Sequence, residues 1–255
     1  MKSGKASTIR RRVRIGLLGI WIAVFGYLFA NMRAIGVDDA VLASDSRVRV
    51  ETTDRGLVFT PLPDTQRTAL LFFPGALVAT KAYAPTARAA AEAGFKAVLV
   101  DVPLTSTWLA SGRERALDLA EGYINDDPER RWVAGGHSLG GKFALALARR
   151  GVALDGLFLV ATSHPREDDF TSLAMPVTKV YGSQDGLASE EEIEQFGVNL
   201  PAHTQWVRVE GANHAHFAHY GRQLGDRKAT IPREAQQAAL RDALRAMLAA
   251  VEQAD

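Results

Sequence analysis

Residues 135–141 read GGHSLGG, a stretch that places four glycines around a single serine. It follows an apolar run, Trp132–Gly135, and precedes an alanine-rich segment, Lys142–Arg150, which predicts a strand that turns directly into a helix at Ser138. Residues 136–140 fit the pattern G-x-S-x-G, in which such a turn raises the serine oxygen above the carboxyl edge of a sheet. Glycine suits the flanking positions because a Cβ would collide where chain segments approach closely. The stretch therefore predicts an exposed hydroxyl at the centre of an α/β fold.

Short apolar runs alternate with longer, alanine-rich segments from about residue 57 onward. The predicted strands are 57–60, 69–73, 97–102, 132–135, 156–161, 177–181 and 205–209. The predicted helices are 82–93, 113–125, 139–150, 189–196 and 233–251. Near-continuous apolar strands separated by helices indicate a mostly parallel sheet covered on both faces, because parallel neighbours need crossover connections. We therefore predict a three-layer α/β domain over residues 56–255.

A serine hydroxyl becomes a good nucleophile when a neighbouring base removes its proton and a carboxylate orients that base. After a G-x-S-x-G turn the acid is expected before the histidine in the chain. Asp185 follows the predicted strand 177–181 in a turn-rich segment and is the predicted acid. The nearby run Glu190–Glu192 fits the first turn of a helix, where acidic side chains suit the helix dipole. His214, on the loop after the predicted strand 205–209, is the predicted base.

Other histidines compete with His214 for this role. His216 and His219 lie on the same loop, and His216 is the second choice, whereas His137 adjoins the serine and is expected to point elsewhere. Three imidazoles within six residues would suit a zinc ion, but their spacing lacks a helical i, i+4 pair. The chain has no cysteine, which excludes disulfides and thiolate ligands. We therefore predict no metal and no cofactor.

Chemistry on a carbonyl also needs backbone N–H groups aimed at the oxygen that becomes negative. The N–H of Leu139, at the start of the helix after the serine, is one predicted donor. The second is expected from the tight turn Pro74-Gly75-Ala76 after the predicted strand 69–73, and Ala76 is the predicted residue.

The charge of the chain is uneven. Residues 1–14 carry six basic side chains and no acidic one, while the remaining residues carry 24 basic and 29 acidic side chains. Nucleic-acid binders carry their basic residues on the folded domain, so the mildly acidic body predicts that nucleic acid is not a partner.

The basic segment is followed by an uncharged run of 18 residues, Ile15–Met32, which is long enough to cross most of a bilayer as a helix. Basic residues beside an apolar span favour the cytoplasmic side. We predict a cytoplasmic tail over 1–14, an uncleaved membrane anchor over 15–32, a spacer over 33–55 and an extracytoplasmic domain. A cleaved signal peptide followed by secretion is the open alternative.

Several stretches of the chain resemble the α/β-hydrolase family over residues 57–251. The strings FFPGALV, RWVAGGHSLGGKFA, DGLFLVATS, VYGSQDGLAS, EGANHAHFAHYG and GDRKATIPREAQQ are similar to the small bacterial hydrolases called alpha/beta hydrolase fold-5, some of them dienelactone-hydrolase-like. The resemblance implies an α/β-hydrolase fold in which Ser138, Asp185 and His214 act as nucleophile, acid and base. Dienelactone hydrolases carry cysteine where this chain has Ser138, so their substrate is not carried over.

These observations together predict a serine hydrolase of the carboxylesterase type that acts on a small, ester-like substrate through an acyl-enzyme. Two alternatives stay open. The same three residues would serve an acyltransferase that passes the acyl group to an alcohol, and a membrane-anchored binding protein could keep the fold without the activity.

Overall fold

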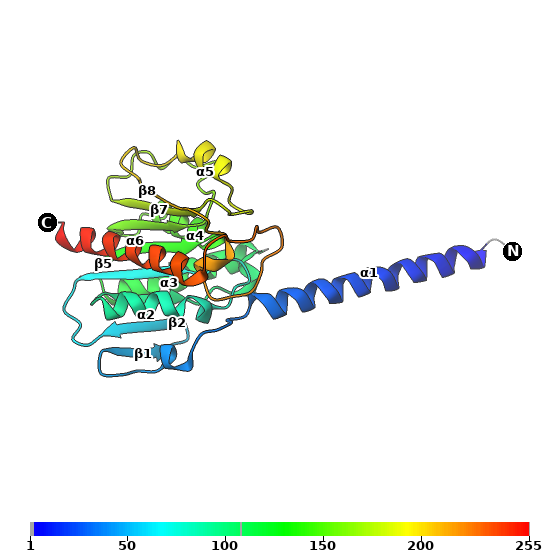
Figure 1. The fold of residues 1–255 in the computed structure, drawn as a ribbon, viewed down its shortest axis with the longest axis horizontal. Helices are drawn as coiled ribbons and strands as arrows, with labels where there is room; N and C mark the ends of the chain where they lie inside the picture. Colours follow the sequence, from blue (N-terminus) through cyan, green and yellow to red (C-terminus); the bar gives the residue numbers. More distant parts are fainter. Residues whose placement is uncertain (1–2, 108, 255) are drawn as a thin grey trace.

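The eight strands form one sheet in the order β1-β2-β4-β3-β5-β6-β7-β8 (Figure 1). They are seen in a computed structural model that describes residues 3–107 and 109–254. The strands are β1 (Val48–Thr52), β2 (Gly56–Pro61), β3 (Thr68–Phe73), β4 (Lys96–Val100), β5 (Arg131–His137), β6 (Gly156–Val160), β7 (Val177–Gly182) and β8 (Gln205–Val209). The strands from β4 to β8 across the sheet are parallel, while β1 and β2 form antiparallel pairs at one edge.

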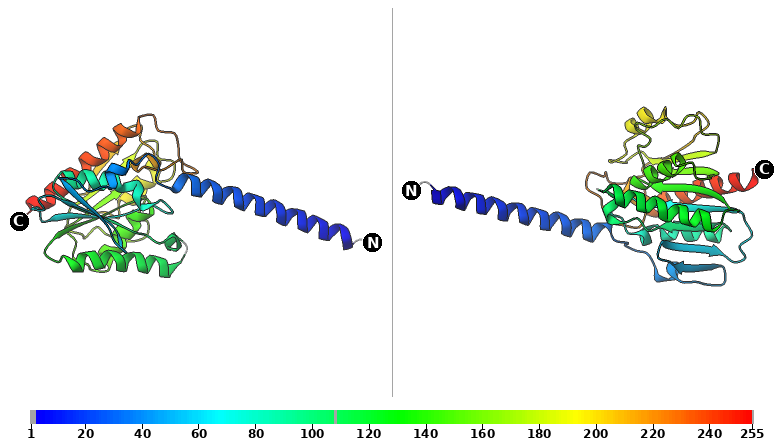
Figure 2. Two further views of the ribbon diagram at one scale, coloured as in Figure 1. Left: turned by 90° about the horizontal axis from the view of Figure 1, so that it is seen from below. Right: turned by 180° about the vertical axis from the view of Figure 1, so that it is seen from behind.

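Helices lie on both faces of this sheet (Figure 2). The α-helices are α1 (Ser3–Met32), α2 (Ala84–Glu92), α3 (Ala110–Asp126), α4 (Leu139–Arg149), α5 (Glu190–Gly197) and α6 (Arg233–Gln253), and the short 3-10 helices are η1 (Asp39–Leu42), η2 (Thr80–Tyr83), η3 (Leu104–Thr107) and η4 (Ala215–Phe217). Helices α2 and α6 pack on one face, and α3 and α4 pack on the other. The predicted three-layer α/β architecture is confirmed.

Strand β3 shows why the central strands are apolar throughout. Leu70 and Phe72 point into the core beneath α2 and α6, whereas Ala69, Leu71 and Phe73 point into the core beneath α3 and α4. Side chains alternate between the two faces of a strand, so a strand covered on both sides has no polar face. The seven strands expected from the sequence are all present.

The segment expected to be a spacer, residues 33–55, is instead part of the folded domain. Val48–Thr52 forms β1, which pairs with β2 at the edge of the sheet. Ahead of it, Val37, Val41 and Leu42 pack against the core under α2 and α6. The predicted spacer over 33–55 therefore differs from the structure, because residues between α1 and β2 form a strand and pack apolar side chains against the core.

Helix α1 projects away from the domain (Figure 1). Its stretch Val13–Met32 is 20 residues long with a mean hydropathy of 1.9, which makes it long and apolar enough to cross a membrane. A signal sequence would pass the same test. Residues 1 and 2 and the side chains of residues 3–12, where most of the predicted basic tail lies, are outside the described part of the structure.

Candidate functional site

Ser138 lies at the tight turn between β5 and α4. Its backbone has φ 55° and ψ −119°, a conformation that a residue with a Cβ adopts only under strain. The backbone N–H of Ser138 donates to the carbonyl of Val160 on the neighbouring strand at 2.9 Å, and its carbonyl accepts from Gly141 N at 3.0 Å. The side chain is half-buried and therefore within reach of solvent at the carboxyl edge of the sheet.

Two glycines let the chain fold so tightly here. A Cβ at Gly136 would lie 2.2 Å from the carbonyl carbon of Gly140, and a Cβ at Gly140 would lie 2.0 Å from the carbonyl oxygen of Phe73. Both neighbours are backbone atoms that cannot move aside without shifting a strand or the helix. The glycines of the motif are required because α4 begins directly against the end of β3.

Asp185 and His214 are hydrogen-bonded to each other, and both are buried. Nδ1 of His214 lies 2.8 Å from Oδ2 of Asp185. The other carboxylate oxygen accepts from the backbone N–H groups of Leu187 and Ala188, each at 2.8 Å. Because a carboxylate accepts hydrogen bonds, Nδ1 carries the proton and Nε2 of a neutral ring is left with a lone pair.

That Nε2 atom is buried and has no hydrogen-bond partner among the described residues, Ser138 included. A buried polar atom without a partner costs free energy and is often found where chemistry takes place. The ring of His137, the residue before Ser138, packs against that of His214 with the centroids 4.6 Å apart, but among the described residues no hydrogen bond joins the Ser138 side chain to His214. In structures without substrate, hydrogen bonds of this kind are often long or misaligned. Nε2 of His214 can therefore accept a proton at the carboxyl edge of the sheet, the edge at which Ser138 lies.

His137 does not point toward the serine hydroxyl but back into the domain, as expected from the sequence. Its Nε2 lies 3.2 Å from the carbonyl oxygen of His214, to which it donates, and its Nδ1 accepts from the hydroxyl of Tyr83 at 2.8 Å. The same hydroxyl oxygen accepts from Gly75 N at 2.9 Å. Burial, followed by the charge of His214 when that ring is protonated, lowers the pKa of His137 well below 6.5, against the smaller raising effect of the hydrogen bond to the His214 carbonyl. A neutral His137 thus links the turn at Gly75 to the loop of His214.

Of the two predicted oxyanion donors, Leu139 follows Ser138 in the chain, and Ala76 lies in the turn after β3, whose last residue Phe73 pairs with Gly136. Leu139 is the first residue of α4, and its N–H has no intrahelical partner because it lies in the first turn. Ala76 lies in a turn closed by a hydrogen bond from Val78 N to the Gly75 carbonyl, 3.2 Å long, and Leu77 in that turn has φ 63°. Within the described part of the chain, neither N–H has a hydrogen-bond partner. Both groups are free to bind an anionic oxygen.

Asp226 holds the start of the His214 loop and was not foreseen from the sequence. Its Oδ1 accepts from the backbone N–H of His214 at 3.1 Å, and its Oδ2 accepts from Ala215 N at 2.9 Å. These are the free N–H groups at the start of η4, so the buried carboxylate caps that short helix. In the sequence Asp226 directly follows Gly225 and begins the string DRKATIPREAQQ. This position was the one hint in the sequence that could have identified Asp226 as a residue of the site.

Two buried glutamines at the start of α6 hold the same loop from the other side. The Gln236 side chain accepts from Asn213 N at 3.1 Å and donates to Asn213 O at 2.7 Å. Gln237 donates to the carbonyl of His216 at 2.6 Å. Polar side chains buried in an apolar core need such partners. They fix the backbone on both sides of His214.

The alternative site residues lie elsewhere. Among the described histidines, His214 is bonded to Asp185, whereas His216 is half-buried with its Nδ1 unpartnered and His219 bonds neighbouring segments through its backbone. Glu190 pairs with Arg208, and Glu192 pairs with Arg166. No three His, Asp or Glu side chains of the described residues cluster as a metal site would require.

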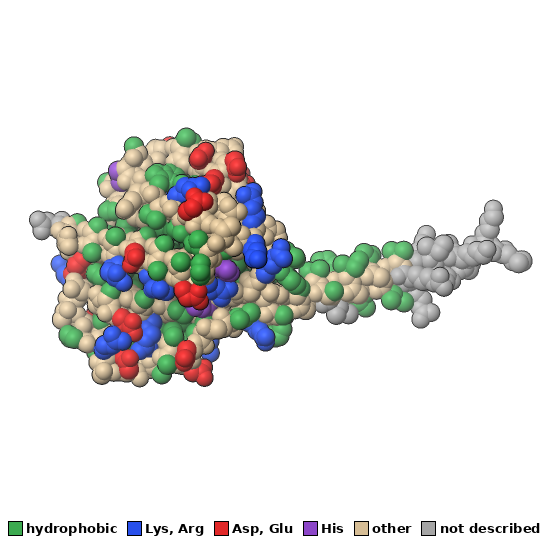
Figure 3. Space-filling view, viewed as in Figure 1, with side chains coloured by type: hydrophobic (Ala, Val, Ile, Leu, Met, Phe, Trp, Pro, Cys, Tyr) green, Lys and Arg blue, Asp and Glu red, His purple; other side chains and the backbone are tan. Residues whose placement is uncertain are grey.

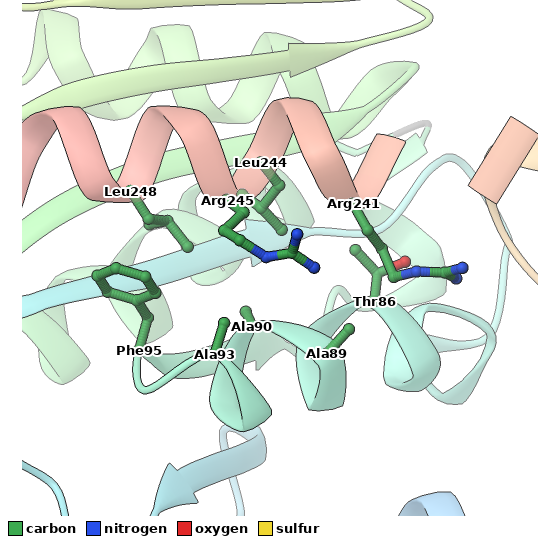
Figure 4. Close-up of a pocket in the computed structure, with 9 residues that line it drawn as sticks. All are labelled: Thr86, Ala89, Ala90, Ala93, Phe95, Arg241, Leu244, Arg245 and Leu248. Carbon is green, nitrogen blue, oxygen red and sulfur yellow. The ribbon is translucent and has the colours of Figure 1, made fainter. Parts of the chain in front are cut away.

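Three cavities of the described part of the chain have linings that do not include Ser138, Asp185 or His214. Figure 4 shows one between α2 and α6, where Phe95 and Leu248 face the alanines of α2 and Arg241 and Arg245 lie along the rim. It encloses about 10 Å³, the room for a single water molecule.

The fold is shared with several solved structures, two of which are described as a hydrolase or as dienelactone hydrolase-like. A "predicted CIB-like hydrolase" from Thermoplasma acidophilum matches with a TM-score of 0.59 and 16% identity over 78% of this chain and 98% of that one. TT1662 from Thermus thermophilus matches with a TM-score of 0.58 and 15% identity over 82% and 100% of the two chains. The dienelactone hydrolase-like promiscuous phosphotriesterase P91 from metagenomic libraries matches with a TM-score of 0.56 and 18% identity over 81% and 98%. At these identities the likeness concerns the fold alone.

A search of curated proteins finds no match to the chain. A family model described as "Alpha/beta hydrolase family" matches residues 69–238, which run from β3 through the site to the first turn and a half of α6. This stretch holds Ser138, Asp185 and His214 and amounts to well over half of the sequence. The protein therefore belongs to the alpha/beta hydrolase family.

Proposed function

We propose that this hydrolase is a serine acyl hydrolase of the carboxylesterase type. Ser138 is the nucleophile, His214 the general base and Asp185 the acid that orients it, and the N–H groups of Leu139 and Ala76 form the oxyanion hole. The observation that carries the proposal is the buried Asp185–His214 hydrogen bond of 2.8 Å, which leaves Nε2 of the imidazole without a partner. An imidazole held in this tautomer is suited to take a proton from a serine hydroxyl.

The reaction follows from these roles. As Oγ of Ser138 bonds to the carbonyl carbon of the ester, its proton passes to Nε2 of His214, and the carbonyl oxygen becomes negative beside the two N–H donors. The bond to the leaving alcohol then breaks while Nε2 returns the proton to that alcohol. In the second half a water molecule loses a proton to Nε2 and adds to the acyl-enzyme, and Oγ regains a proton as the acid leaves. Hydrogen bonds from Leu187 and Ala188 keep the Asp185 carboxylate in place throughout.

The proposal includes a membrane anchor that is retained. The N-terminal tail lies in the cytoplasm and the catalytic domain on the other side, in keeping with the basic residues ahead of the apolar span. Contacts at the end of α1 support retention rather than cleavage, because Tyr27 Oη donates to the Arg222 carbonyl at 2.7 Å and Met32 is buried in the core. A signal peptide that is removed has no need of such contacts.

Activity and covalent labelling test the assignment together. Ser138→Ala is expected to abolish hydrolysis of p-nitrophenyl butyrate and labelling by a fluorophosphonate probe, because both require the Oγ nucleophile. Ser189→Ala removes the side-chain cap of α5 and serves as the control, with both signals retained. Hydrolysis by the folded Ser138→Ala protein would refute the proposal, and a product that appears only with an added alcohol would indicate acyl transfer.

A further inference from the structure

The end of helix α1 is fixed to the two loops that form the candidate site. The carbonyl of Met32 accepts from Ala79 N at 2.9 Å, three residues beyond Ala76. The carbonyl of Asn31 accepts from Gly221 N at 2.7 Å, and Ile35 N donates to the carbonyl of His219 at 2.8 Å. The helix therefore leaves the domain at the carboxyl edge of the sheet, where Ser138 stands, and not at the opposite edge (Figure 1).

No polar spacer separates the apolar helix from the domain. Phe25 and Phe29 are 61% and 80% exposed, whereas Met32, one turn further, is 5% exposed and belongs to the domain core. Three residues of α-helix rise by about 4.5 Å. If α1 crosses a bilayer, the surface around Met32 must therefore lie at the level of the lipid headgroups.

The loop 221–228 crosses from α1 to the candidate base along this surface. Gly221 and Arg222 bond the helix, and Asp226 bonds the backbone of His214. Between these contacts the side chain of Leu224 is 58% exposed. Leu224 is therefore an exposed apolar side chain on the loop that joins the end of α1 to the backbone of His214.

Basic side chains gather on the same side of the domain, next to α1 (Figure 3). The exposed ones in the sequence segments that contact the helix end are Arg33, Lys81, Arg222, Arg227 and Lys228. None of them forms an ion pair with another residue that the structure describes. Unpaired cations at a membrane surface are attracted by anionic headgroups. These cations can therefore contact lipid headgroups, while the exposed Asp38 and Asp39 of the segment after α1 carry the opposite charge.

From these contacts we infer that the catalytic edge faces the membrane and that the substrate is an amphiphilic acyl ester whose chain lies in the bilayer. The inference rests on the proposed acyl hydrolase function and on the retained anchor. It assigns Leu224 and the neighbouring basic residues to the membrane surface. A soluble ester can still reach Ser138, but a bilayer ester is presented to it at far higher local concentration.

The orientation can be measured without any activity. The chain has no cysteine, so a single cysteine takes a thiol-reactive fluorophore at one chosen position. In full-length protein reconstituted into vesicles with a headgroup spin-labelled lipid, the label of Leu224→Cys is expected to be quenched. The label of Ala153→Cys, at an exposed position before β6 on the opposite edge of the sheet, is the control and is expected to stay bright. Equal brightness of the two labels overturns the orientation.

Substrate preference is measured with two esters that share a leaving group. Full-length protein in vesicles is given p-nitrophenyl butyrate in solution, or p-nitrophenyl palmitate dissolved either in the same vesicles or in separate ones. We expect palmitate hydrolysis to be at least about tenfold faster in shared vesicles, in keeping with the gain from effective concentration. Butyrate hydrolysis without this difference for palmitate overturns the inference and leaves the proposed function intact. Hydrolysis of neither ester refutes the proposed function itself.

Discussion

Tyr83 is the residue whose single hydroxyl joins the two loops beside Ser138. It accepts from Gly75 N and donates to His137, which in turn holds the carbonyl of His214. Tyr83→Phe leaves a buried N–H without an acceptor, which costs about 1–3 kcal/mol of stability. Because the turn that holds the proposed oxyanion donor Ala76 and the His214 loop lose their common support, we expect kcat for p-nitrophenyl butyrate to fall while KM changes little. Thermal unfolding and steady-state kinetics measure the two effects.

Tyr123→Phe is the matched control for this substitution. Its hydroxyl is also buried in part and bonds the hydroxyl of Thr53 at 2.6 Å, outside the candidate site. A similar loss of stability is expected here, with kcat unchanged. If both variants lose kcat to the same extent, Tyr83 has no positioning role.

Helix α6 covers the sheet and also fixes the backbone of the loop that carries His214. Its buried Gln236 makes two hydrogen bonds to the backbone of Asn213, the residue before His214. Gln236→Leu replaces the amide by an apolar side chain of similar size and leaves both backbone groups of Asn213 without these partners. A shift of about 1 Å in a catalytic group can cost about a hundredfold in rate, so we expect kcat to fall by about tenfold or more. The same kinetic assay on p-nitrophenyl butyrate measures it.

Gln195→Leu, an exposed substitution on α5, serves as the comparison. It should leave kcat unchanged because α5 makes no bond to the His214 loop. An unchanged kcat for the folded Gln236→Leu protein would show that α6 does not position the base.

At the scale of the whole molecule, several histidine side chains and one lysine are buried or half-buried. The free energy of unfolding therefore depends on pH. Burial lowers the pKa of His137, His164, His216 and His219 below 6.5, that of His164 to about 4. Below pH 6.5 the unfolded chain therefore binds more protons than the folded one, and stability falls as the pH drops. Burial also lowers the pKa of Lys179 from 10.5 to about 7, so stability rises as the pH increases from 7 toward 10. Apparent melting temperatures at pH 5, 7 and 9 should increase in that order.

The substitution Lys179→Met separates the contribution of Lys179 to the pH dependence of stability from that of the buried histidines. Lys179 is fully buried in β7 and donates to the carbonyl of His164 at 2.9 Å. The variant should lose the increase between pH 7 and 9 and keep the decrease below pH 6.5. An unaltered increase in the variant would contradict the role of Lys179.

Most of the sheet could be predicted because its central strands are continuous apolar runs. Strand β1 was missed, since Val48–Thr52 mixes two valines with charged and polar residues, as suits an edge strand with one solvated face. Ser138, Asp185 and His214 could be selected because a short motif and the order of the loops identify them. Tyr83, Asp226 and Gln236 could not, because their partners lie 54, 12 and 23 residues away and the bonds form only in the folded chain.

The amino-acid sequence by itself determined the layered α/β architecture, the strained turn at Ser138 and the apolar N-terminal helix, since each depends on side chains close together in the chain. Only the tertiary structure decided that Asp185 bonds His214 and not a neighbouring histidine, and that α1 ends beside the loops of Ala76 and His214. Those relations depend on how loops from distant parts of the chain pack together at one edge of the sheet. The local conformational preferences of the residues do not specify that packing.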